Sequence, residues 1–217
     1  MTNHDSDGLF EGEAEERSEL AWTEQDWERY LAAQEQAVRN YAAHYDKLAM
    51  APDRIDQVAR LMGWEIAEQD AEALAVDEDD SDADFSDAWE PYTTQCNPVY
   101  IATQALQGQL LAAWEKTVAA SPHLATPAAL RVQSALHLQQ TQSLHAIQAL
   151  EMGDYTLAVC FFKRALRALN ETLAALEEAG PGRALADFRL WARPRLFDLR
   201  EIWLRIMAEC RVESDPD

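Results

Sequence analysis

The sequence predicts an all-α fold, either a helical bundle or a set of stacked helical hairpins, with about six helices. Three observations favour this class. Only 7 glycines and 8 prolines occur in 217 residues, which is typical of helices rather than of turn-rich β proteins. Apolar residues recur at steps of three and four along most of the chain, the spacing that places them on one face of a helix. A hydrophobic content of 48% is enough for one substantial core.

Charged residues divide the chain into a tail, a folded domain and an insert within that domain. Residues 1–21 are rich in Asp and Glu and contain few large apolar side chains, and such a segment cannot bury enough surface to become ordered. We therefore expect a mobile, disordered acidic tail at 1–21 and a single helical domain at 22–217. Within the domain we predict a helical hairpin at 22–76, an acidic linker at 77–97 and a four-helix portion at 98–211.

The predicted hairpin begins at Thr23, because Thr23 and Asp26 have the spacing of an N-terminal capping pair. Its first helix ends before Pro52, and Asp53 can cap a second helix. The apolar faces are expected to consist of Trp27, Leu31, Val38, Tyr41, Tyr45 and Leu48 on the first helix, and of Ile55, Val58, Met62, Ile66 and Ala73 on the second.

Two prolines mark the starts of the next two predicted helices. Pro98 suits a first helical turn, where its missing N–H costs nothing, and this helix is expected to run to about residue 119. Thr126 followed by Pro127 is typical of an N-cap and a first helical residue, and predicts a helix to about residue 151. The side chains expected to face inward from the first of these helices are Val99, Thr103, Leu106, Leu110, Trp114 and Val118.

Glycines mark both ends of the fifth predicted helix. Gly153 and Asp154 break the chain before the fifth helix, and Gly180 with Pro181 and Gly182 ends it. The sixth helix is expected over 183–211, where Pro194 would kink or split it. The fifth helix has a regular apolar stripe, which consists of Tyr155, Val159, Phe162, Leu166, Leu169, Leu173 and Leu176.

The negative charge excess lies entirely in the first half of the chain. Residues 1–115 carry 27 acidic and 6 basic residues, whereas residues 116–217 carry 12 of each. This distribution favours a basic protein as the partner and argues against nucleic acid, because an anionic surface repels a polyanion. Acidic segments with interspersed aromatic residues can order on a complementary surface. The predicted partner-binding residues are Asp77, Asp79, Asp80, Asp82, Asp84, Phe85, Asp87 and Trp89.

The second half of the chain offers an alternative, internal partner for residues 77–90 of the acidic linker, which we call the acidic insert. Its basic residues are concentrated in the last two predicted helices, at Lys163, Arg164, Arg167, Arg183, Arg189, Arg193, Arg195, Arg200, Arg205 and Arg211. Residues 77–90 could lie on this arginine-rich face, with Phe85 or Trp89 as an apolar anchor. The other interpretation is that these charges are ordinary solvated helix positions.

Residues 146–166 resemble the turn and second helix of a tetratricopeptide repeat. The resemblance rests on Gly153 at the turn, Tyr155 two residues later, and Ala158, Phe162 and Ala165 at helical spacing. It implies two closely packed helices and a peptide-binding architecture. The match covers about 20 residues and has no second copy at the repeat period of about 34 residues, so generic hairpin packing is the alternative.

Residues 39–44 resemble the Arg-Asn-x-x-x-His motif of HEPN domains, helical bundles that include RNA-cleaving toxins. The resemblance rests on Arg39, Asn40 and His44. It implies that Arg39 stabilises phosphate charge and that His44 transfers protons. The position of the motif in the first long helix, and the acidic half of the chain around it, depart from the expectation for a nuclease. The alternative places Arg39 on a solvated face and His44 beside the apolar stripe.

Other sites are not predicted. Asp77, Asp79 and Ser81 fit the first ligand positions of an EF-hand loop, but Asp82 and Ala88 stand where that loop needs glycine and glutamate. No cofactor or metal is predicted. The three cysteines, Cys96, Cys160 and Cys210, are widely spaced and indicate reduced thiols.

The leading hypothesis is a non-catalytic acidic helical protein that binds another macromolecule. The start of the sequence lacks the basic region and apolar core of a secretory signal, and no apolar stretch reaches the roughly 20 residues of a membrane helix. These features predict a cytoplasmic protein without a membrane partner. Two alternatives remain: a HEPN-like RNA-cleaving domain or an inactive relative, and a structural subunit that assembles with copies of itself.

Overall fold

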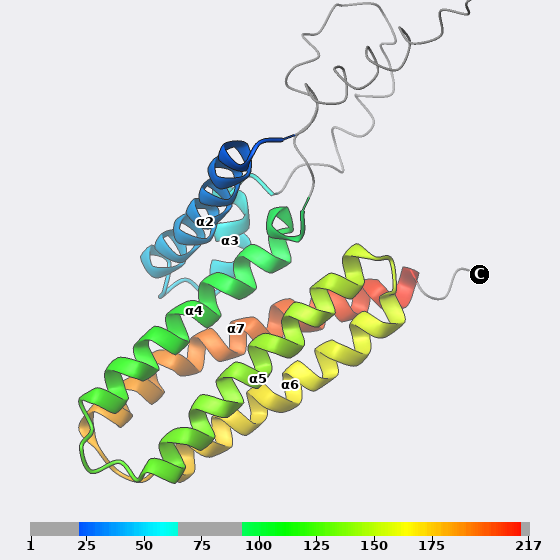
Figure 1. The fold of residues 1–217 in the computed structure, drawn as a ribbon. Coiled ribbons are helices and arrows are strands. Elements are labelled where there is room, and N and C mark those ends of the chain that lie inside the picture. The colour runs from blue at the N-terminus through cyan, green and yellow to red at the C-terminus, as the bar shows by residue number, and fades with distance from the viewer. Residues whose placement is uncertain (1–21, 65–92, 214–217) are drawn as a thin grey trace, which may run out of the picture. The chain divides into compact units, whose positions relative to one another are not determined.

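A computed structural model describes residues 22–64 and 93–213 (Figure 1). In these ranges every regular element is a helix, so the predicted all-α class is confirmed. The tail at 1–21 and the acidic residues at 77–90 lie outside the described residues. The elements are α2 (Glu24–Lys47), α3 (Arg54–Leu61), the short 3-10 helix η1 (Thr94–Cys96), α4 (Pro98–Ala119), α5 (Thr126–Glu151), α6 (Tyr155–Glu178) and α7 (Arg183–Glu213).

The chain divides into two compact units, residues 1–37 and 38–217, with the boundary inside α2. In the first unit, the backbone N–H of Asp26 donates to Thr23 Oγ1 (3.3 Å) and the N–H of Thr23 donates to Asp26 Oδ2 (3.1 Å). The predicted capping pair is therefore confirmed. These hydrogen bonds, with the Thr23 hydroxyl contributing most, lower the pKa of Asp26.

The apolar face predicted for the start of α2 is partly wrong. Tyr30 is buried, whereas Trp27 and Leu31 are 39% and 40% exposed. Trp22 and Trp27 contact each other and the ring of Tyr30, with centroid distances of 5.0 to 5.9 Å. Because this aromatic group forms within one helical turn and its flank, Trp27 packs on Trp22 and Tyr30 and stays partly exposed.

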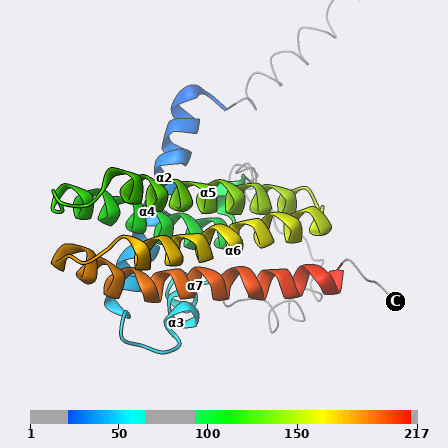
Figure 2. The same cartoon turned by 90° about the horizontal axis from the view of Figure 1, so that it is seen from below.

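In the second unit, α4, α5, α6 and α7 form a four-helix bundle (Figures 1 and 2). Contacts join α4 to α5, α5 to α6, α6 to α7 and α7 back to α4, so each helix has two neighbours. Large apolar side chains fill the centre of this bundle and are fully buried. They include Leu106, Leu110, Trp114, Leu136, Ile147, Phe162, Leu169, Leu196, Leu199 and Trp203.

Among the described helices, the most extensive contact is between α5 and α6. Their buried surfaces are rich in alanine, as the sequence pattern indicated, and small side chains let two helices approach each other. The glycine between them, Gly153, has φ +73°. The buried alanines are Ala135, Ala146 and Ala149 on α5, and Ala158, Ala165, Ala168 and Ala175 on α6.

Polar side chains form hydrogen bonds between helices inside the bundle. Gln107 Nε2 donates to Ser143 Oγ (3.1 Å), the Thr172 hydroxyl donates to Gln139 Oε1 (3.4 Å), and Trp203 Nε1 donates to Thr103 Oγ1 (3.1 Å). These bonds join α4 to α5, α5 to α6, and α4 to α7. Because a buried polar group without a partner is costly, they restrict the register in which the four helices can pack.

The second helix of the predicted hairpin is shorter than expected. It ends at Leu61, where Gly63 adopts φ +75°. The N–H of Trp64 donates to Ala59 O and the N–H of Gly63 donates to Arg60 O, both at 3.0 Å. This is a Schellman motif, which terminates a helix. The expected continuation through Met62, Ile66 and Ala73 is therefore wrong at Met62, and residues 65–76 lie outside the described residues.

The same motif ends α5. There the N–H of Asp154 donates to Ala149 O (3.0 Å) and the N–H of Gly153 donates to Leu150 O (2.9 Å). At the helix starts, Asn97 Oδ1 accepts from Val99 N (2.8 Å), which confirms the start predicted at Pro98. The start of α5 is shifted by one residue, because Ala125 is its N-cap and Thr126 is already helical.

Pro194 does not split α7, which is continuous from Arg183 to Glu213. Ala192 and Leu196 on either side of it are fully buried, so packing on the bundle holds the helix together. Pro194 and Leu190 lie on the exposed face of α7, where water can hydrogen-bond to the carbonyl that proline leaves unpaired. None of the helices in 22–64 and 93–213 combines the length and apolar composition of a membrane span.

Candidate functional site

Three ion pairs connect residues 46–56 to one edge of α7. They join Asp46 to Arg195, Arg54 to Asp198, and Asp56 to Arg205. We call these six residues the charged seam. Because all six belong to the unit 38–217, the seam holds the end of α2, the start of α3 and α7 together.

The central pair of the seam is largely buried. The side chains of Arg54 and Asp198 are 15% and 11% exposed. Arg54 Nε donates to Asp198 Oδ2 (2.5 Å) and Arg54 Nη2 donates to Asp198 Oδ1 (2.8 Å). The Tyr45 hydroxyl donates to the same carboxylate and accepts from Arg54 Nε (3.0 Å). A two-point contact of this kind fixes both distance and orientation.

The second pair has further polar and aromatic contacts. Arg195 Nη2 donates to Asp46 Oδ1 (2.5 Å) and Arg195 Nε donates to Gln109 Oε1 (3.0 Å). Gln109 Nε2 in turn donates to Asp46 Oδ2 (3.0 Å). The Arg195 guanidinium lies 3.8 Å from the Trp191 ring centroid and 5.3 Å from that of Tyr45. Cation–π contacts and hydrogen bonds together compensate the burial of Arg195.

Two groups of the seam, Arg54 and Arg205, and the adjacent Tyr45 have raised pKa values. Burial, and next the hydrogen bond to Asp198, raise the pKa of Tyr45 well above that of a solvated tyrosine. Burial opposes the charge of Arg54, but the hydrogen bonds to Asp198 and Tyr45 outweigh it and raise the pKa of Arg54. Hydrogen bonds to Asp56 and Glu201 raise the pKa of Arg205. These three groups therefore suit structural cohesion rather than proton transfer near pH 7.

Outside the seam, α7 carries an exposed apolar row. Leu190, Phe197 and Leu204 are 79%, 46% and 39% exposed. They are seven residues apart, so each is rotated by only about 20° around the helix axis from the one before it. Exposed apolar side chains that gather on one face are typical of interaction surfaces.

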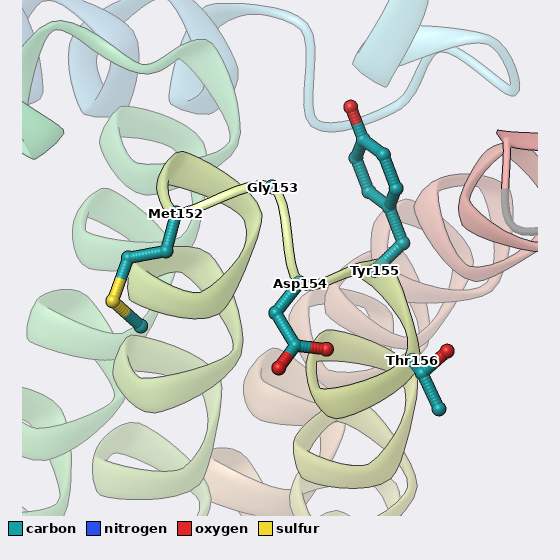
Figure 3. A pocket seen from close by; sticks show the side chains of 5 residues that line it. All are labelled: Met152, Gly153, Asp154, Tyr155 and Thr156. Atoms are coloured by element: carbon teal, nitrogen blue, oxygen red, sulfur yellow. The ribbon is translucent and has the colours of Figure 1, made fainter.

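The turn between α5 and α6 forms a shallow hollow lined by Met152, Gly153, Asp154, Tyr155 and Thr156 (Figure 3). Asp154 Oδ1 accepts from the N–H of Leu157 (2.9 Å) and so caps α6. In the part of the chain that the structure describes, no three His, Cys, Asp or Glu side chains gather as metal ligands would. The hollow therefore offers a capped helix start rather than a set of reactive groups.

The HEPN-like residues lie on α2. Arg39 and Asn40 are exposed and His44 is half-buried. Five residues on a helix correspond to about 140° around its axis, so Arg39 and His44 do not share a face of α2. Arg131 and His137 on α5 form a looser version of the same motif, and they have different contacts: Arg131 binds Glu171 (2.7 Å) and Glu178, whereas His137 contacts Gln133 (2.7 Å).

The predicted partner-binding residues lie outside the described ranges. They are Asp77, Asp79, Asp80, Asp82, Asp84, Phe85, Asp87 and Trp89. The arginines predicted to receive them are divided in their contacts. Arg195 and Arg205 belong to the seam, Arg189 donates to Leu176 O (2.7 Å), and Arg193 binds Glu177 (3.0 Å). Lys163, Arg167 and Arg200 are exposed on α6 and α7.

Sequence reasoning missed the seam. Asp46, Arg54, Asp56 and Asp198 were not singled out, because charged residues at helical spacing look like solvated positions. One signal was present: Asp198 lies one residue before Leu199 and four before Ile202, on the side of α7 that the apolar pattern predicts to be buried. A charged residue on that side needs a partner.

The fold and the seam define a class: a four-helix bundle to which a preceding helical segment is joined by charged residues. No protein-family model, curated protein or solved structure matches the chain.

Proposed function

We propose that the protein is a non-catalytic binding protein, whose helical part carries strongly acidic segments to a basic protein partner. The observation that supports this proposal is the distribution of charge. Residues 1–21, 65–92 and 214–217 hold 21 of the 39 acidic residues and one of the 18 basic residues. The described helices and turns hold the remaining 18 acidic and 17 basic residues, so they are nearly neutral.

Part of the charge of the helical part is used within it. Asp46, Asp56 and Asp198 bind arginines in the seam, and Glu171, Glu177 and Glu178 bind arginines between helices. By the counts above, the net charge of −21 is carried almost wholly by the segments outside the described helices. Such a concentration of charge steers association with a basic surface and makes it sensitive to salt.

Titratable groups with displaced pKa values often mark catalytic sites. Here Tyr45, Arg54 and Arg205 are engaged in hydrogen bonds that join helices. Their perturbation has a structural cause, which supports a binding function over a catalytic one.

The proposal is tested by affinity purification of the full-length chain from its native cells, at 50 mM and 500 mM NaCl, followed by mass spectrometry. We expect basic proteins at low salt, their loss at high salt, and no dependence on nuclease treatment. Partners that are retained equally at both salt concentrations, or that are lost on nuclease treatment, would contradict the proposal.

A HEPN-like ribonuclease remains the alternative proposal. It is favoured by the accessibility of Arg39 and Asn40 on α2, and it requires Arg39 and His44 to meet, across two copies of the chain, at one RNA. Cleavage of a mixed-sequence RNA that is abolished in His44→Ala, and retained in the control His145→Ala, would support it. Equal activity of wild type and His44→Ala would remove it.

A further inference from the structure

The outer surface of α6 and α7 combines apolar and basic side chains. The apolar part is the row of Leu190, Phe197 and Leu204, described above. On the helical circle of α7, Arg200 lies about 60° from Phe197, on the side that faces α6. The register of the two helices is set by Arg193, which binds Glu177 (3.0 Å), and by Arg189, which donates to Leu176 O (2.7 Å).

This register brings three basic side chains to two adjacent turns of the bundle. The helices α6 and α7 run side by side in opposite directions (Figure 2). Seven residues after Arg193, Arg200 therefore lies level with the turn of α6 that contains Arg167, and Lys163 is one turn further along. Among the described residues, no hydrogen bond or ion pair involves Lys163, Arg167 or Arg200. We call these three residues and the apolar row the α6–α7 face.

We propose that the α6–α7 face binds an acidic peptide segment with an aromatic anchor, and that its occupant is residues 77–90 of the same chain. Charge complementarity supports this choice: the segment carries six Asp and two Glu without a basic residue, opposite three cations that lack a described partner. Phe85 and Trp89 supply the apolar side chains that the row of Leu190, Phe197 and Leu204 can cover.

The length of chain on either side permits this contact. Trp64 stacks on Tyr41 with centroids 5.6 Å apart, and Tyr41 stacks on Tyr45, which binds Asp198 of α7. The segment that follows Trp64 therefore begins near α7. Thirteen residues from Trp64 to Asp77 span up to about 43 Å, and three residues from Glu90 to Thr93 up to about 10 Å. Neighbouring helices are only about 8–10 Å apart.

Docking in the same chain would regulate the proposed function, because the carboxylates that bind the α6–α7 face are those that a basic partner would bind. The partner then has to displace the segment, and both interactions weaken with salt. The inference uses the same segment as the proposed function but does not require that function to be correct, since docking is measured on the isolated protein.

The test is hydrogen exchange of the full-length chain, followed by mass spectrometry of peptides from residues 77–90. In the wild type at 50 mM NaCl, we expect exchange about tenfold slower than in an unstructured peptide. The triple variant Lys163→Glu, Arg167→Glu, Arg200→Glu should lose this protection. A matched triple variant, Lys116→Glu, Arg164→Glu, Arg183→Glu, changes the same number of exposed basic residues elsewhere and should retain it.

A variant within the segment, Phe85→Ala with Trp89→Ala, should also lose protection and leaves the bundle unchanged, so a folding defect in the first triple variant does not decide the outcome. Unprotected amides in the wild type, or equal protection in both triple variants, would overturn the proposal. Protection that appears only at concentrations where sedimentation detects a dimer would assign the face to a second copy of the chain, and would overturn it as well.

Discussion

Two interfaces in the unit 38–217 differ in the kind of side chain that forms them. Between α5 and α6, alanines such as Ala158 and Ala165 are fully buried and the helices pack closely. Between residues 46–56 and α7, the contact consists of the charged seam, centred on Arg54 and Asp198. The first interface joins helices that are adjacent in sequence. In the seam, the two residues of an ion pair are about 150 residues apart in sequence.

The comparison shows why net charge is a poor guide to the surface of this protein. Acidic residues of the first half, Asp46 and Asp56, bind arginines of the second half, and Arg54 and Asp198 bind with the opposite polarity. The described residues are nearly neutral, because they hold 18 acidic and 17 basic residues. The charge that remains for a partner lies in the segments outside them.

The largest expected effect comes from breaking the seam. Asp198→Ala leaves the Arg54 guanidinium without its carboxylate, and the loss of one partner from a buried pair costs about 3 kcal/mol of unfolding free energy. Chemical denaturation measures it. In the exposed control Glu177→Ala, whose ion pair with Arg193 is more than 60% exposed on both sides, the loss should stay below about 1 kcal/mol. Equal losses in the two variants would contradict a structural role for the seam.

The alanine interface should be sensitive to size rather than to charge. Ala165 is completely buried, so Ala165→Leu forces α5 and α6 apart and should cost about 2 kcal/mol. Thermal unfolding followed by circular dichroism measures this change. The control Ala186→Leu, at an exposed position of α7, should leave stability almost unchanged. A neutral Ala165→Leu would mean that the two helices are not closely packed in solution.

Tyrosines beside the seam predict a loss of stability at high pH. Burial, which is the main cause for both, raises the pKa of Tyr41 and Tyr45 in the folded protein. Above about pH 10, an unfolded tyrosine loses its proton while these two keep theirs. The folded state then binds more protons than the unfolded state, so stability falls as pH rises.

The expected loss is about 1.4 kcal/mol per tyrosine at pH 11. Denaturation midpoints between pH 8 and pH 11 measure it, and Tyr41→Phe with Tyr45→Phe should flatten the decline. A decline of unchanged slope in the double variant would rule out these two side chains as its source.

The two Schellman motifs predict a smaller, purely conformational effect. Gly63 and Gly153 have φ of +75° and +73°, and a Cβ added to either meets no atom within 4 Å. Each of Gly63→Ala and Gly153→Ala should therefore cost about 1 kcal/mol, through the left-handed backbone alone. The control Gly108→Ala, in the middle of α4, should be neutral or stabilising. Unfolding by urea compares the three.

What could be predicted from the sequence depended on local pattern. The helix α6 and the break at Gly153 follow from the spacing of neighbouring residues, and both are confirmed. The stripe is confirmed in part, because its buried members are Val159, Phe162, Leu169 and Leu176, whereas Tyr155, Leu166 and Leu173 are half-buried. The end of α3 was mispredicted although Gly63 carries the same signal as Gly153, because the apolar positions continue through Ile66 and masked the stop. The pairing of Arg54 with Asp198 depends on tertiary contact over 144 residues, and no local pattern encodes it.

The central claim is that the charge available to a partner lies in the acidic segments outside the described helices, above all in residues 77–90, and not on the described helices. It is tested by two variants with the same change in net charge. Asp77, Asp79, Asp80 and Asp82→Asn neutralise the insert, whereas Glu28, Glu115, Glu209 and Glu213→Gln neutralise exposed positions on the helices.

The measurement is the dissociation constant of each variant for the basic protein recovered by affinity purification, at 50 mM NaCl. The insert variant should bind about tenfold more weakly than the wild type, which corresponds to about 1.4 kcal/mol for four ionic contacts, and the helix variant should bind almost as tightly as the wild type. Equal weakening in both variants, or weakening in the helix variant alone, would contradict the claim.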